Sequence, residues 1–281
     1  MPEPGRLLTT LQRAARAFRA TPGRRGRVVR LPAGCEVLIA GDMHGSVENF
    51  RLLLKTADLG ANPRRHLVLQ ELVHGPFRYP GGGDKSHQLL DLLAALKCQY
   101  PERVHFLLGN HELAQWQNQR IGKGDVDQNV LFRAGVDEAY GDHGPAIYAA
   151  YLELFAAASV LLFTANRVVL CHTLPSAKHL AVFALDALER DEPEPRDLLL
   201  GGAIHAMVWD RDLSQANAEA FLRKVDGDWL ITGHIPCERG FMVPNNRQII
   251  LDALGTPACY CRFPTDRAVT QDELVSMISE L

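Results

Sequence analysis

Short apolar runs alternate with segments of helical periodicity along most of this chain. The runs are typical of buried strands, and the segments between them repeat apolar residues every three or four positions. The expected strands span residues 37–40, 66–69, 104–108, 160–163, 168–171, 229–232, 248–251 and 259–263. The expected helices span residues 7–18, 46–58, 86–98 and 145–158, and a capping box at Thr270 and Glu273 opens a last short helix.

The order of these elements predicts the fold class. Strand–helix–strand–helix–strand order over residues 37–108 favours a mixed or parallel sheet covered by helices. A second group of strands follows residue 160, so we expect an α/β protein with two mixed β-sheets stacked between helices, a four-layer αββα sandwich. We divide the chain into an N-terminal segment at 1–30, a main domain at 31–265 and a C-terminal helix at 266–281.

The net charge of the whole chain is ordinary, but basic residues are concentrated near the N-terminus. The chain has 281 residues, of which 47% are hydrophobic and 22% charged, and its net charge of -3 favours neither nucleic acid nor a membrane surface as a partner. Residues 1–30 nevertheless hold eight arginines and a single acid, Glu3. An arginine-rich amphipathic helix there is compatible with an acidic partner or anionic lipid and, more simply, with a solvated flank.

Hydropathy and cysteine usage indicate the compartment. No apolar run approaches the roughly 18–20 residues that a membrane span needs, and the N-terminus lacks the apolar stretch of a secretory signal. The six cysteines are scattered without paired C-x-x-C motifs, so we expect them to be reduced and mostly buried. These features predict a cytoplasmic protein.

Potential metal ligands follow five of the predicted strands. In open α/β sheets, loops beyond the carboxyl ends of strands diverge and form binding sites. Two of the residues lie two positions apart in one loop, where flanking glycines allow close approach of the backbone. The candidates are three oxygen donors and three imidazoles, namely Asp42, His44, Glu71, Asn110, His172 and His234.

This donor set predicts a pair of divalent cations. Six ligands exceed what one zinc ion uses, and mixed carboxylate, amide and imidazole donors suit manganese, iron, cobalt or zinc. Two metals sharing a bridging carboxylate can clamp the attacking and leaving oxygens of an in-line displacement. Hydrolysis of a phosphate ester is the reaction that such a site indicates. The remaining histidines, at 66, 87, 105, 143, 179 and 205, belong to no such pattern.

The ordered motifs resemble the calcineurin-like metallophosphoesterase superfamily, and within it the phosphoprotein phosphatase (serine/threonine phosphatase) branch. The likeness covers roughly residues 36–263 and includes the helix-then-strand passage from Lys85 to Glu112. The motifs that carry it are Gly41-Asp42-Met43-His44-Gly45, Gly109-Asn110-His111-Glu112, His172 after a strand, Trp209-Asp210 and Gly233-His234.

The resemblance implies a role for each candidate. Asp42 and His44 would hold the first metal, and Glu71 would bridge to the second. The second metal would be completed by Asn110, His172 and His234. His111 would be the general acid that protonates the leaving alkoxide. The implied reaction is hydrolysis of phosphomonoesters by direct attack of a hydroxide bound to both metals, with manganese favoured as the metal and a phosphoprotein or small phosphoester as substrate.

One segment departs from the branch's Gly-Asp-x-x-Asp-Arg-Gly pattern. Glu71 stands where the bridging Asp is expected, one methylene longer. His74 replaces the Asp that orients the general acid, and Gly75 replaces the phosphate-binding Arg, so we expect both functions to be lost. An apparent insertion follows at 77–83.

Several alternatives stay open at this point. Arg78, in the insertion, and Arg211, after the Trp209-Asp210 pair, are candidates for binding the phosphate, although either could be a plain surface residue. Asp84 is a second candidate for the bridging carboxylate, less well placed than Glu71. The altered segment also permits a nucleotide or dinucleoside polyphosphate hydrolase, or a metal-binding pseudophosphatase whose catalysis is weakened.

Overall fold

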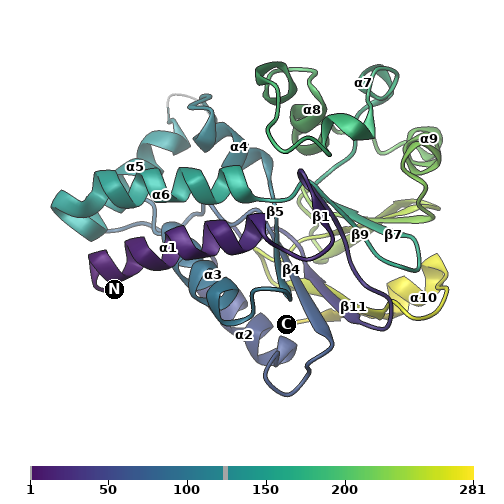
Figure 1. The fold of residues 1–281 in the computed structure, drawn as a ribbon, viewed down its shortest axis with the longest axis horizontal. Coiled ribbons are helices and arrows are strands. Elements are labelled where there is room, and N and C mark those ends of the chain that lie inside the picture. Colours follow the sequence, from purple (N-terminus) through teal and green to yellow (C-terminus); the bar gives the residue numbers. More distant parts are fainter. Residues whose placement is uncertain (1, 123–125) are drawn as a thin grey trace.

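The strands of the protein form two sheets that lie face to face between helices (Figure 1). The computed structural model describes residues 2–122 and 126–281. The first sheet has seven strands in the order β1-β2-β6-β7-β8-β10-β9, and the second has five in the order β12-β11-β3-β4-β5. Both sheets are mixed, and the predicted α/β fold class with two mixed sheets flanked by helices is confirmed.

The bounds of the elements agree with most of the expected segments. The strands are β1 Arg24–Arg25, β2 Val28–Arg30, β3 Glu36–Ala40, β4 Arg65–Gln70, β5 Val104–Leu107, β6 Leu161–Phe163, β7 Val168–Cys171, β8 Trp229–Thr232, β9 Phe241–Asn245, β10 Gln248–Leu251, β11 Cys259–Pro264 and β12 Ile278–Glu280. The helices are α1 Pro4–Arg19, α2 Val47–Ala57, α3 His87–Gln99, α4 Asn110–Trp116, α5 Gln128–Tyr140, α6 Gly144–Ala157, α7 Ala177–Leu180, α8 Ala203–Trp209, α9 Gln215–Val225 and α10 Gln271–Ser276, with short 3-10 turns at Gly141–His143, Leu185–Ala187 and Pro195–Leu198.

The alternating direction of side chains along the central strands explains why each sheet has a hydrophobic layer on both faces. In β3, Val37 and Ile39 belong to the core between the sheets, whereas Leu38 and Ala40 belong to the core beneath the helices. Successive side chains of a strand point to opposite faces, so a strand that is apolar at every position needs a hydrophobic layer on both sides. The second sheet supplies one layer. The helices supply the other, with α3 packed on β5 and α9 packed on β8 and β9.

The N-terminal helix packs on the rest of the molecule. Helix α1 lies against α3 and α6 (Figure 1), and Leu7, Leu11 and Phe18 on its inner face are buried. A buried lysine secures its end, because Lys97 Nζ donates to Thr21 Oγ1 at 2.8 Å and lies 4.5 Å from the centre of the Phe18 ring. The apolar face of α1 is therefore covered, and most of its arginines remain on the outer face.

The C-terminal segment differs from the expectation. Residues 266–281 were expected to be a helix, but α10 ends at Ser276 and β12 then pairs antiparallel with β11. The edge of the five-stranded sheet explains the difference, because β11 offers unpaired backbone groups that a returning strand satisfies. Strands β1, β2 and β9 were also not among the expected strands. No helix in the described parts of the chain is long and apolar enough to cross a bilayer.

Removal of one leucine tests whether α1 stabilises the whole fold. Leu11 has no exposed surface, so Leu11→Ala should leave a cavity and lower the free energy of unfolding by about 2–5 kcal/mol. Gln12→Ala on the exposed face of the same helix is the matched control, with an expected change within about 0.5 kcal/mol. Urea unfolding followed by circular dichroism would measure both. Equal stability of the two variants would contradict the packing described here.

Candidate metal centre

The predicted ligands lie together at one edge of the two sheets. Strands β3, β4 and β5 are parallel, as are β7 and β8, so their carboxyl ends open towards the same region of each sheet. The loops after these strands carry the candidates. Asp42 and His44 follow β3, Glu71 follows β4, Asn110 and His111 begin α4 after β5, and His172 and His234 follow β7 and β8.

The Glu71 carboxylate is the centre of the cluster. Its Oε2 lies 2.5 Å from His172 Nε2, and its Oε1 lies 3.4 Å from His111 Nε2 and 3.8 Å from His44 Nε2. The residue is 1% exposed. Two groups of potential ligands share this carboxylate, one made with His44 and His111 and the other with His172 and His234. The sharing agrees with a bridging position for Glu71.

The orientation of two imidazoles follows from their neighbours. Gln70 Nε2 donates to the Ala40 carbonyl at 3.1 Å, so its Oε1 accepts from His172 Nδ1 at 3.1 Å. The Nε2 lone pair of His172 therefore faces Glu71. In the same way His44 Nδ1 donates to the Val73 carbonyl at 2.9 Å, which leaves the Nε2 lone pair of His44 free. Partners of this kind fix a histidine in the tautomer that a metal requires.

The facing atoms are chemically suited to a cation. The inward end of the Asn110 amide lies 3.1 Å from His172 Nε2 and 3.3 Å from both oxygens of Glu71. With the amide oxygen inward, it lies 2.8 Å from His234 Nδ1 but also faces two further acceptors, His172 Nε2 and the Glu71 carboxylate, and a shared cation or a proton on Glu71 resolves their repulsion. With the amide nitrogen inward, Asn110 itself would be the donor. The donor set fits a divalent cation.

Asp42 has different neighbours from those the sequence suggested. The motif pairs it with His44, but its Oδ2 accepts the His234 backbone N–H at 2.6 Å and its Oδ1 lies 3.7 Å from His172 Nδ1. Asp42 Oδ1 is buried and has no hydrogen-bond partner among the described residues. A buried carboxylate oxygen without a donor is costly, and a cation would satisfy it.

Burial dominates the electrostatics of the cluster. It raises the pKa of Glu71 to about 7 and raises the pKa of Asp42 well above its usual range, an effect that the neighbouring Glu71 increases. Burial also lowers the pKa values of His172 and His234, which keeps both rings neutral. The centre thus holds carboxylates and neutral imidazoles with little compensating positive charge, as expected of a site that binds cations.

Backbone strain is concentrated in the same loops. His44, Glu71, His74 and His234 all have positive φ angles, of 41°, 42°, 62° and 70°. Such a conformation costs of the order of 1 kcal/mol for a residue with a Cβ, and it persists where the surrounding structure enforces it. Part of the enforcement comes from Glu112, whose carboxylate accepts the backbone N–H groups of Leu72 at 2.7 Å and Gly109 at 3.1 Å.

His111 has a partner that the sequence reasoning did not anticipate. The replacement of an Asp by His74 was expected to remove the residue that orients the general acid. In the structure His74 Nδ1 lies 3.0 Å from His111 Nδ1, and His74 Nε2 lies 2.8 Å from Gln115 Oε1. The sequence reasoning expected the orienting function to be lost with the Asp, whereas the structure places a side chain at position 74 within hydrogen-bond distance of His111.

The two candidate arginines differ in their surroundings. Arg211 Nε donates to His234 Nε2 at 3.0 Å, which places it at the cluster. Because a guanidinium only donates, the proton of this ring is on Nδ1, and cation binding through Nδ1 requires the contact to open. Arg78 instead contacts the Gly75 carbonyl and lies 3.5 Å from buried Asp84. Asp84 also accepts from Ser86 N, so its contacts are with the insertion and not with Glu71.

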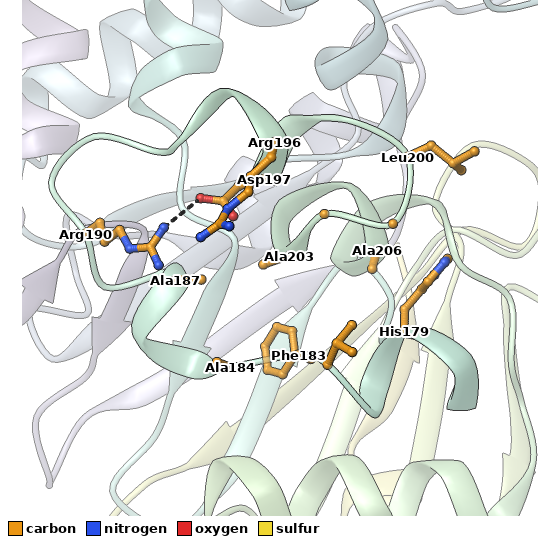
Figure 2. A pocket seen from close by; sticks show the side chains of 13 residues that line it. His179, Phe183, Ala184, Ala187, Arg190, Arg196, Asp197, Leu200, Ala203 and Ala206 are labelled. Atoms are coloured by element: carbon orange, nitrogen blue, oxygen red, sulfur yellow. Dashed lines mark hydrogen bonds and ion pairs between the residues drawn. The ribbon is translucent and has the colours of Figure 1, made fainter.

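A separate cavity lies in the segment between β7 and α8 (Figure 2). It has a volume of about 440 Å³ and is lined by residues including His179, Phe183, Arg190 and Ala203. Arg190 is paired with Asp197 at 3.3 Å across its wall. None of the predicted metal ligands lines this cavity. His179 connects its wall with the neighbourhood of the cluster, because His179 Nδ1 contacts Asp210 Oδ2 at 2.6 Å beside Arg211.

Sequence reasoning missed three buried polar residues around the cluster. Gln70 and Gln115 are 0% and 1% exposed, and Glu112 is 0% exposed. Glu112 belongs to the Gly109–Glu112 motif, which is a signal that the sequence does contain. Gln70 directly precedes Glu71, and an apolar run, Leu67–Leu69, that ends in an amide was a second signal. Gln115 offered none, because a glutamine within a helix is unremarkable on its own.

Comparison with known proteins identifies the family. The model of the calcineurin-like phosphoesterase family matches residues 36–238, so the chain belongs to this family. It is 25% identical over 174 residues to a protein phosphatase 2A catalytic subunit of Dictyostelium discoideum, a match that covers 62% of this chain and 48% of the relative. The chain therefore spans about half the length of that relative.

Solved structures share the fold at low sequence identity. A protein serine/threonine phosphatase from Saccharomyces cerevisiae superposes with a TM-score of 0.66 at 16% identity, covering 90% of this chain and 78% of that one. A cold-active protein-tyrosine phosphatase of the psychrophile Shewanella sp. gives a TM-score of 0.59 at 13% identity, with coverage of 89% and 80%. The predicted superfamily and its phosphoprotein phosphatase branch are confirmed.

The raised pKa of Glu71 predicts pH-dependent cation binding. Below about pH 7 the carboxyl of Glu71 holds a proton that a cation must displace. We therefore expect the affinity for Mn²⁺ to rise about tenfold per pH unit up to about pH 7 and then to level off. Titration calorimetry of the full chain would measure this slope. Glu71→Gln, which has no proton to lose there, should bind weakly and with a shallower slope, because Asp42 is then the remaining carboxyl with a raised pKa, and a flat wild-type profile would contradict the assignment.

Proposed function

We propose that the chain is a hydrolase of phosphate monoesters that depends on two divalent cations sharing Glu71. The observation that supports this most directly is the shared carboxylate, which belongs to two groups of potential ligands at once. A single structural cation would need neither the second group nor the partly exposed His111 at its edge. Membership in the calcineurin-like phosphoesterase family supports the same reaction.

We assign the cations to residues of five loops. Asp42 and His44 would hold the first and Asn110, His172 and His234 the second, with Glu71 common to both. Two such cations would act as Lewis acids on the phosphoryl oxygens and would make water a nucleophile near neutral pH. Manganese suits this mixture of carboxylate, amide and imidazole donors, as iron, zinc and cobalt also do. Asp42 and Glu71 together would offset part of the positive charge of the two cations.

His111 and Arg211 act on the substrate in this proposal. The Nε2 of His111 faces the centre, 3.4 Å from Glu71 Oε1, where it can give a proton to the leaving oxygen. Arg211 is the guanidinium next to the ligands, and opening of its contact with His234 frees Nε to bind a phosphoryl oxygen. Arg78 is the weaker candidate, because the Gly75 carbonyl and Asp84 already engage it.

A phosphorylated protein is the substrate that we favour. The support is the likeness to the protein phosphatase 2A catalytic subunit of Dictyostelium discoideum and to a solved serine/threonine phosphatase. All six cysteines are unpaired, so we place the reaction in a reducing compartment such as the cytoplasm. Phosphopeptides and nucleotides assayed side by side would separate this substrate class from nucleotide or dinucleoside polyphosphate hydrolysis.

Turnover of p-nitrophenyl phosphate with added Mn²⁺ tests the proposal. Asp42→Asn, Asn110→Ala and His172→Ala should each lower kcat by at least about a hundredfold, because each removes a ligand. His143→Ala, which changes an exposed histidine, is the matched control and should keep wild-type activity. Full cation binding by the wild type without turnover would contradict the proposal and favour a pseudophosphatase.

The role of His111 has its own test. His111→Ala should keep cation binding but lower kcat by about 10²–10⁴-fold on phenyl phosphate, because general acids contribute this much when the leaving group is poor. The loss of kcat on p-nitrophenyl phosphate should be far smaller, since p-nitrophenoxide is a good leaving group that departs without a proton. An equal loss on both substrates would exclude the general-acid role.

A further inference from the structure

A chain of hydrogen-bonded side chains, of which His74 and Gln115 are buried, leads away from Nδ1 of His111. His111 Nδ1 lies 3.0 Å from His74 Nδ1, His74 Nε2 lies 2.8 Å from Gln115 Oε1, and Gln115 Nε2 donates to the Tyr148 hydroxyl at 2.7 Å. His74 comes from the loop after β4, Gln115 from α4 and Tyr148 from α6. His111 and Gln115 stand four positions apart on one face of α4, so His74 can contact both.

The order of donors in this chain follows from chemistry. The Gln115 oxygen only accepts, so the proton of the neutral His74 ring is on Nε2. His74 Nδ1 is then an acceptor, and His111 Nδ1 must be the donor in the contact between the two rings. Burial lowers the pKa of His74 to about 4, in keeping with a neutral ring. His111 Nε2 remains as the nitrogen that faces Glu71. As the general acid, His111 is therefore an imidazolium, with one proton on Nδ1 shared with His74 and a second on Nε2 that passes to the leaving oxygen.

We propose that His74 is a positioning residue that accepts a hydrogen bond from His111 Nδ1 and thereby turns His111 Nε2 towards the reacting phosphate, and that Gln115 sets the direction of this hydrogen bond. The inference rests on the proposed function, because it assumes that His111 gives a proton to the leaving group. An imidazole differs from a carboxylate at this position, since it accepts only if its second nitrogen is held protonated. Gln115 supplies that condition.

Packing around His74 limits other orientations of its ring. The residue is 5% exposed, and its ring meets Phe132 edge-on at 5.9 Å between centroids. Its backbone N–H donates to Ser86 Oγ at 3.0 Å and its φ angle is 62°, so the backbone is fixed as well. A rotation of the ring would break the contacts with both His111 and Gln115 at once. The ring is therefore suited to holding one orientation of His111.

Paired variants at positions 74 and 115 test the inference. Asn can present an oxygen near the place of His Nδ1, whereas Leu cannot accept. We expect His74→Leu to lower kcat on phenyl phosphate by about 10–100-fold with little change in KM or in Mn²⁺ binding, and His74→Asn to restore most of the rate. Gln115→Glu, whose carboxylate can only accept, should keep kcat near the wild-type value. Gln115→Leu should lower kcat about as much as His74→Leu. Gln119→Leu, at an exposed glutamine after the same helix, is the control.

Nitrogen NMR of the His111 ring gives a readout independent of turnover. The wild type should show His111 protonated on Nδ1, and His74→Leu should shift the ring towards a mixture of tautomers. If Gln115→Glu loses as much rate as Gln115→Leu, or if the tautomer of His111 is unchanged in His74→Leu, the inference is wrong. Absence of turnover in the wild type would instead refute the proposed function, and the NMR result would still decide the positioning role.

Discussion

The structure of this site depends on one buried carboxylate, that of Glu71. Burial is the dominant influence on this carboxylate and outweighs the stabilisation of its charge by His44, Arg211 and the His111 backbone N–H, because it raises the pKa of Glu71 to about 7. A carboxylate taken out of water without a partner either keeps its proton or binds a cation. The two sheets determine this outcome together, because β4 places Glu71 while β7 and β8 of the other sheet place His172 and His234.

The loops that carry the ligands have strained backbone conformations, and contacts from several parts of the fold hold them. Four residues of the cluster region adopt left-handed backbone conformations, and buried side chains hold the loops in place. Glu112 ties the loop after β4 to the start of α4, and Gln70 ties β3 to His172 through its two amide atoms. Each brace joins elements that are far apart in sequence. The strain is thus supported by the same contacts that orient the ligands.

The sequence predicted elements with regular apolar spacing and the points where apolar strands end in polar residues. Apolar strands ending in Asp, Glu, Asn or His were visible, and they predicted both the fold and the meeting of the ligands. Contacts between distant residues were not visible, because periodicity says nothing about which loops touch. The pairing of His74 with Gln115, the approach of Asp42 to His172, and the return of the chain as β12 all depend on such contacts. The sequence likewise did not show that Arg78 lies next to Asp84, which engages its guanidinium.

The neutral ring at position 74 is consistent with the charge of its surroundings. Asp42, Glu71 and Glu112 are already buried in this region, and burial together with Glu71 raises the pKa of Glu112 to about 8. A fourth carboxylate at position 74 would add to a repulsion that the free chain bears before any cation binds. An imidazole accepts the same hydrogen bond without that charge, at the cost of requiring a partner for its second nitrogen. Replacement of a carboxylate by His74 and the presence of a buried Gln115 are therefore two parts of one electrostatic solution.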